Sequence, residues 1–167
     1  RAYRRDLDAA MLTAFPNLRP VRICAGALGP GLPERDLLVS RQHRMLVRSR
    51  IAARMFGEDE VLVPAIRLTE LPGIDIADDV QTVCYVHLLF ETHQVIYAEG
   101  APTESLYTGA ETLRALAPQV RTEILTLFPD LATQRPEPAR PIPEGRRQRR
   151  LIARHRKIRH PLAARML

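Results

Sequence analysis

The sequence predicts a mainly β domain with short helices, followed by a C-terminal helical tail that is rich in arginine. Three observations predict this fold class. Short apolar segments, separated by glycine, proline and polar clusters, recur between residues 21 and 106. Helical spacing of apolar residues is found near the start of the chain and again after Gly109. Ten of the 25 basic residues stand in the last 28 positions of the chain, most of them after a proline-rich segment and against a single acidic residue.

The tail differs from the rest of the chain in charge. Ten arginine or lysine residues lie between Arg140 and Leu167 against Glu144 alone, which gives this part a net charge of +9 and leaves −3 for residues 1–139. The sequence pI of about 10.1 therefore describes the tail. We expect a solvated helix that packs loosely on the domain. The alternative is weak contact with nucleic acid or an anionic surface through residues 146–159.

These shifts in composition predict three parts. Residues 1–131 form a domain, residues 132–145 form a linker with four prolines, and residues 146–167 form the basic helical tail. No apolar stretch approaches the length that spans a bilayer, and no signal peptide opens the chain. The sequence leaves the cellular compartment unknown.

The chain opens with an expected amphipathic helix over residues 6–15, which Pro16 ends. A strand over residues 21–24 and a loop rich in glycine and proline follow. That loop matches no phosphate-binding pattern, and the sequence signals no cofactor. Later helices are expected at residues 50–56, between Ser49 as cap and Gly57 as stop, at about 64–70, and between Gly109 and Phe128. Further strands are expected at residues 37–39, 45–47, 60–63, 80–90, 93–98 and 101–106.

Residues 80–98 carry the strongest strand signal. Both faces of residues 83–90 are largely apolar, which predicts a central strand. Glu91 and Thr92 are expected to turn the chain back into the strand that starts at His93. Cys24 and Cys84 lie in apolar segments far apart in sequence, and no CxxC spacing signals a metal site. We expect two buried thiols, and a disulfide between them is the alternative.

The most informative stretch is residues 36–47, in which two apolar runs flank the polar sequence Ser40-Arg-Gln-His43-Arg. Residues i and i+3 approach each other across a tight turn, so a hydroxyl and an imidazole are expected side by side. Spacing alone leaves a second interpretation open, in which Ser40 caps the turn and His43 is an ordinary surface residue.

Three blocks in this order resemble the bacterial branch of the Hedgehog/intein, or Hint, domains. They are LLVSRQHRMLV, EDEVLVPAIRL and YVHLLFETHQVIYAEGAPTES, and the resemblance runs from about Pro20 to Leu131. It implies a compact, mostly β fold that rearranges its own peptide bond. A Cys or Ser at the start of such a domain attacks the preceding carbonyl, and a T/S-x-x-H motif polarises and protonates the bond.

By this resemblance, Ser40 and His43 occupy the T/S-x-x-H positions, and His93 matches a later histidine of the family. These three residues are the candidate catalytic residues, while neither a cofactor nor a metal is implied. The chain departs from the pattern in two ways. Thr103-Glu104-Ser105 replaces the His-Asn junction at which inteins cyclise, and no family-type nucleophile precedes Ser40.

We therefore expect an N-terminally truncated copy whose partner is its own upstream polypeptide. Single-turnover self-cleavage is expected only if that upstream segment supplies the nucleophile, and splicing is not expected. Two alternatives from other classes remain: a non-catalytic structural or export-associated module, and a nucleic-acid-binding protein that acts through its basic tail.

Overall fold

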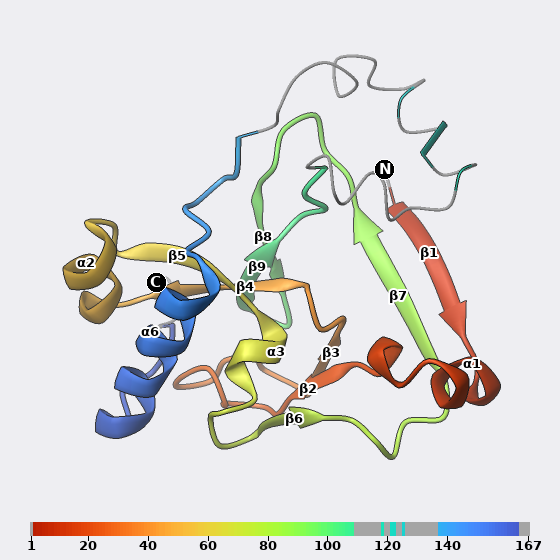
Figure 1. Ribbon diagram of the computed structural model, residues 1–167, viewed down its shortest axis with the longest axis horizontal. Coiled ribbons are helices and arrows are strands. Elements are labelled where there is room, and N and C mark those ends of the chain that lie inside the picture. Colours follow the sequence, from red (N-terminus) through yellow and green to blue (C-terminus); the bar gives the residue numbers. More distant parts are fainter. Residues whose placement is uncertain (1, 109–117, 119–120, 123–124, 126–136, 164–167) are drawn as a thin grey trace.

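The computed structural model describes residues 2–108, 118, 121–122, 125 and 137–163 (Figure 1). The strands are β1 (Ala2–Leu7), β2 (Val21–Ile23), β3 (Leu37–Val39), β4 (Arg44–Arg48), β5 (Glu60–Pro64), β6 (Ile74–Ile76), β7 (Val83–Leu88), β8 (Val95–Ala98) and β9 (Ala101–Glu104). The helices are α1 (Ala9–Ala14), η1 (Pro16–Leu18), α2 (Arg50–Phe56), α3 (Ala65–Leu68) and α6 (Gly145–Ile158). Most of the predicted helical region from Gly109 to Phe128, the boundary at residue 131 and residues 164–167 lie outside the described residues.

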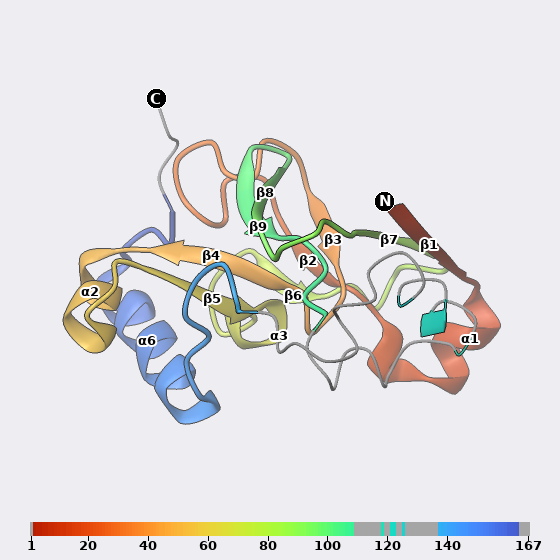
Figure 2. The same cartoon turned by 90° about the horizontal axis from the view of Figure 1, so that it is seen from above.

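The strands form three antiparallel sheets. The largest has the order β5-β4-β9-β8, the second has the order β3-β2-β6, and the third is the pair β1-β7. Short helices join them, so the prediction of a mainly β fold is confirmed. Both views place the β1-β7 ribbon on the opposite side of the molecule from α6 (Figures 1 and 2).

One hydrophobic core joins the two larger sheets to three helices. Its strand residues alternate along β2, β4 and β5, and α2, α3 and α6 close it from outside (Figure 2). Fully buried members include Ile23, Met45, Val63, Leu68, Leu151 and Ile152. Each such side chain stabilises the fold by about 1.5–3 kcal/mol relative to an exposed one.

Helix α6 belongs to this core, so the expectation of a loosely packed tail is wrong. Leu151 and Ile152 are completely buried, and the segment that follows the helix adds Leu162 and Ala163 to the same cluster. The amide of Arg48 donates to the Leu162 carbonyl at 2.8 Å, which ties this segment to β4. Sequence reasoning weighted the charge of the tail and missed the helical spacing of its few apolar residues.

The start of the chain and β7 also differ from expectation. The predicted helix over residues 6–15 is shorter, because residues 2–7 form β1 and Asp8 caps α1 by accepting from the Met11 amide at 2.9 Å. Strand β7 is not central, since among the described residues its strand partner is β1 alone. β8 does not pair with β7 either; it forms a hairpin with β9. The face of β7 that carries Cys84, Val86 and Leu88 is exposed.

Both cysteines are free, yet the expectation that both are buried is wrong. Cys24 is half-buried and Cys84 is exposed on β7. Among the described residues, no helix is long and apolar enough to cross a membrane.

Candidate functional site

The turn between β3 and β4 holds two of the predicted site residues. The amide of His43 donates to the Ser40 carbonyl at 3.1 Å, which is the i to i+3 hydrogen bond of a β-turn. β3 and β4 belong to different sheets, so the chain passes from one sheet to the other here. The first residues of α3 secure the turn, since the Ala65 amide donates to the His43 carbonyl at 2.8 Å. The expected strand, tight connection and strand are confirmed.

The His43 ring is held by β9. Its Nε2 lies 2.5 Å from the hydroxyl of Thr103, and that hydroxyl lies 2.8 Å from the Arg44 carbonyl oxygen. A carbonyl oxygen only accepts, and a threonine hydroxyl has one proton to donate. Thr103 therefore donates to Arg44 and accepts from His43. This fixes the tautomer: Nε2 of His43 carries the proton and Nδ1 keeps the lone pair.

His43 is also neutral at physiological pH. Burial is the main cause that lowers the pKa of His43, which is about 4 overall; Glu104 opposes this shift, and the nearby His87 and Arg44 add to it. A neutral ring with a free lone pair can accept a proton from an attacking group. Once protonated, a ring with so low a pKa is a strong proton donor, so one side chain can perform both transfers.

Behind Thr103, a buried ion cluster forms around Glu104. Its carboxylate accepts from the Arg44 amide at 2.9 Å and from the Arg44 guanidinium at 3.0 and 3.2 Å. His93 Nε2 lies 3.2 Å from the same carboxylate. Burial raises the pKa of Glu104, but His93 and Arg44 outweigh it and the net pKa is lowered. Glu104 is therefore an anion that fixes β9 against β4.

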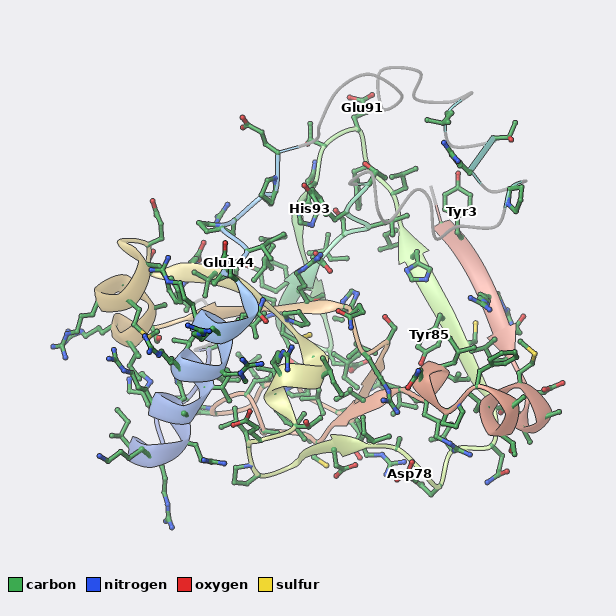
Figure 3. All side chains as sticks on the ribbon, viewed as in Figure 1. Tyr3, Asp78, Tyr85, Glu91, His93 and Glu144 are labelled. Atoms are coloured by element: carbon green, nitrogen blue, oxygen red, sulfur yellow. The ribbon has the colours of Figure 1, made fainter. Side chains whose placement is uncertain are left out.

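His93 lies within this cluster and not on an exposed hairpin. It is buried, and its Nδ1 accepts from the Ala139 amide at 3.0 Å, so in the neutral ring the proton is on Nε2, the nitrogen that lies 3.2 Å from the Glu104 carboxylate. Its ring also packs against Tyr107, with 4.9 Å between the ring centres. In Figure 3 Glu91 stands at the outer tip of the loop before β8, while His93 lies further in. His93 is therefore not an ordinary hairpin residue with a half-exposed ring.

A cavity of about 460 Å³ opens in front of the turn. Its walls come from the β3–β4 turn, from β7 and from the β8–β9 hairpin. Among its lining residues are Ser40, His43, Cys84, His87, Tyr97 and Ser105. The cavity brings Ser40 and His43 to one open space, as the sequence predicts, whereas His93 is not among its lining residues.

Two lining residues other than Ser40 could in principle act as nucleophiles, but their contacts disfavour it. Ser105 is buried and its hydroxyl accepts from the Gln94 amide at 2.9 Å. Cys84 is exposed, and its hydrogen bond with Asp6 raises the pKa of the thiol. A raised pKa keeps the sulfur protonated and weakly nucleophilic.

The sequence does not reveal Thr103 as the partner of His43, and it singles out Glu104 only as part of the segment that replaces the His-Asn junction. The two residues are adjacent at the end of β9, so their side chains leave opposite faces of the strand. Thr103 faces the turn and Glu104 faces the Arg44–His93 cluster. No spacing rule within the sequence could reveal this, because β4 and β9 lie some 60 residues apart in the chain.

No group of three or more His, Cys, Asp and Glu side chains suited to a metal ion occurs within the part of the chain that the structure describes. The site therefore consists of the neutral His43 ring, whose tautomer is set by the Thr103 hydroxyl, and of Ser40, which lines the same cavity. The buried ion cluster around Glu104 lies behind Thr103. Such a site suits proton transfer at a bond held in the cavity.

Comparison with models of protein families matches residues 1–110 to the family described as Hint domain. Neither the comparison with curated proteins nor that with solved structures found a match.

Proposed function

The chain belongs to the Hint domain family, and from this premise we propose that it acts in self-processing, by an acyl shift and peptide-bond cleavage at an N-terminal junction. The fold class and the cavity at the β3–β4 turn agree with such a role. The observation that carries the proposal is the neutral His43 ring beside that cavity, with its tautomer set by Thr103.

In the proposed reaction, the nucleophile is a hydroxyl or thiol of the upstream polypeptide. It attacks the carbonyl of the peptide bond that precedes it, and His43 Nδ1 accepts its proton. The C–N bond then breaks, the same proton passes to the leaving nitrogen, and a C–O or C–S bond has replaced the amide. Water attacks the resulting ester or thioester, which releases a carboxylate and regenerates the nucleophile.

Ser40 and Glu104 act at different distances from that bond. Ser40 lines the cavity and is placed to orient the peptide. Glu104 is a positioning residue, because it fixes β9 and thereby the Thr103 hydroxyl that holds His43. His93 stabilises Glu104 from behind, so we propose for it a positioning role rather than contact with the substrate.

The reaction is proposed to stop at cleavage. Where inteins carry the His-Asn junction, this chain has Thr103-Glu104-Ser105. Glu104 has no amide to cyclise and is held by Arg44. This supports a single cleavage without a second junction.

The test is to express the domain together with its natural upstream sequence and follow the products by mass spectrometry at neutral pH, with and without dithiothreitol. We expect an N-terminal fragment to be released, faster with the thiol if the intermediate is a thioester. His43→Ala should slow release at least about 100-fold, the usual contribution of general acid–base catalysis.

His160→Ala is the matched control, because His160 is exposed and remote from the cavity. It should cleave at the rate of the unchanged protein. Absence of cleavage over days in the folded protein would contradict the proposal and favour a non-catalytic structural or export-associated module. Equal cleavage rates for His43→Ala and His160→Ala would show that His43 takes no part in the reaction.

A further inference from the structure

Helix α6 has two faces of opposite character. Its buried face follows helical spacing and consists of Gln148, Leu151, Ile152 and His155. The opposite face also follows helical spacing, at positions i, i+3, i+4, i+8 and i+11, and all its members are exposed cations. We call this face the arginine stripe; it consists of Arg146, Arg149, Arg150, Arg154 and Lys157.

The stripe is not neutralised within the described part of the chain. The ion pairs there include one cation of α6, Arg156, which lies 3.9 Å from Glu70 on the flank of the helix. Arg147 is also engaged, since it donates to the Met55 carbonyl and stacks over the Phe56 ring. No described carboxylate pairs with a member of the arginine stripe. The five charges therefore repel one another, and this favours binding of an anion.

The helix that carries the stripe is held rigidly. The Ser49 hydroxyl lies 3.0 Å from His155 Nε2, and His155 Nδ1 lies 3.0 Å from the His160 carbonyl oxygen. Gln148 Nε2 donates to the Pro143 carbonyl at 2.7 Å. These contacts, with Leu151 and Ile152 in the core, orient the helix before any partner arrives. Because the helix is already fixed in place, binding of a partner to the arginine stripe requires little further ordering of the backbone that carries these charges.

We propose that the arginine stripe is a docking surface for the phosphate backbone of double-stranded nucleic acid, independent of base sequence. The stripe spans about 16 Å along the helix axis. A duplex carries one negative charge per about 1.7 Å of its axis, so several phosphates lie within this reach. Four of the five cations are arginine, whose planar guanidinium binds phosphate with two hydrogen bonds.

A membrane surface fits this face less well. A helix that lies in a bilayer interface buries a continuous apolar face beside its cations. The apolar face of α6 is already buried in the protein, and Ile158, 60% exposed, is the one large apolar side chain that the described helix presents to solvent. Nitrogen-tipped side chains project from the outer side of the helix (Figure 3). The stripe thus offers charge without an apolar anchor.

The test is fluorescence anisotropy of the full chain with a labelled 20-base-pair DNA duplex of arbitrary sequence, between 50 and 200 mM NaCl. Five phosphate contacts predict that the logarithm of affinity falls with the logarithm of salt concentration with a slope of about −4.5. Arg149→Gln with Arg150→Gln should weaken binding at least about tenfold at 50 mM NaCl and make the slope shallower by about 2.

The matched control is Arg4→Gln with Arg5→Gln, which removes the same charge from an adjacent arginine pair on β1, away from α6. It should bind as the unchanged protein does. Equal weakening by both double variants, or no binding at 50 mM NaCl, would overturn the proposal. So would binding to vesicles of anionic phospholipid without binding to the duplex. The circular dichroism spectrum of each variant confirms that it is folded.

Discussion

At the scale of single residues, the site depends on one hydroxyl proton. Thr103 can donate to only one acceptor, and the Arg44 carbonyl takes that proton, so His43 must donate from Nε2. The contact between His43 Nε2 and Thr103 on β9 therefore leaves the lone pair of the ring on Nδ1. A residue that takes no part in the proposed bond rearrangement thus decides which nitrogen of His43 is available for chemistry.

Replacing Thr103 tests this assignment. Thr103→Val keeps the shape but removes the hydroxyl, which leaves the Arg44 carbonyl and His43 Nε2 without this partner. We expect the free energy of unfolding to fall by about 1–3 kcal/mol in urea denaturation. Thr103→Ser keeps the hydroxyl, so its free energy of unfolding should fall by less than that of Thr103→Val.

Nitrogen NMR of the His43 ring in the unchanged protein gives a second readout. It should report the proton on Nε2 at pH 7. A proton found on Nδ1 would contradict the hydrogen-bond assignment, whatever the stability of the variants.

At the scale of elements, prediction from sequence succeeded where the signal is local. Ser49 accepts from the Ala52 amide, and Gly57 ends α2 in the left-handed region with φ of 80°. Both follow from residue type at fixed spacing. Prediction failed where pairing is long-range: β1 was missed because its partner β7 lies some 80 residues away. The apolar residues of β7 predict a central, buried strand, yet Val86 is 58% exposed.

The docking of α6 can be tested at its link to α2. The Ser49 hydroxyl accepts from the Ala52 amide and contacts His155, so it stabilises α2 and binds α6 to it. Ser49→Ala should lower the free energy of unfolding by about 2–4 kcal/mol, as the sum of a lost helix cap and a lost buried hydrogen bond.

Asp8→Ala removes the equivalent cap of α1 at an exposed position without a tertiary link. It should lower the free energy of unfolding by about 1 kcal/mol. If both substitutions lower the free energy of unfolding by the same amount, the Ser49–His155 contact contributes nothing to the docking of α6.

At the scale of the whole molecule, three histidines couple stability to pH. Burial lowers the pKa of His43, His87 and His155 in the folded protein. In the unfolded chain these histidines become protonated near pH 6.5. In the folded protein their pKa values are lower, and that of His43 is about 4. Stability is therefore complete above pH 6.5 and falls as the pH drops from 6.5 toward 4.

Urea denaturation at pH 7.5, 6.0 and 5.0 measures this loss. We expect the free energy of unfolding to decrease between pH 7.5 and 5.0, with about 2 kcal/mol from His43, whose pKa falls from 6.5 to about 4 on folding. His87 and His155 contribute in the same direction. His43→Gln should flatten the profile below pH 6.5, because it removes one of the three titrating rings. A profile that stays level from pH 7.5 to 5.0 would show that these rings are not buried as described.

Family, fold class and the Ser40–His43 turn could be predicted from the sequence because each rests on a contiguous block of residues. The Glu104 cluster and the burial of His93 could not, because they need the crossing of β4, β9 and the segment at Ala139. Residue 139 lies in the predicted linker, and the sequence of an extended proline-rich segment does not indicate which side chain it contacts.

The burial of Leu162 and Ala163 also has a consequence for biosynthesis. A ribosome releases the chain from its N-terminus onward, so the strands emerge well before the residues that complete their core. Until Leu151, Ile152, Leu162 and Ala163 have left the exit tunnel, the hydrophobic cluster that they share with β4 and β5 is incomplete. The core therefore closes late in translation, and any processing that depends on the folded His43 site has to wait for nearly the whole of this chain to be made.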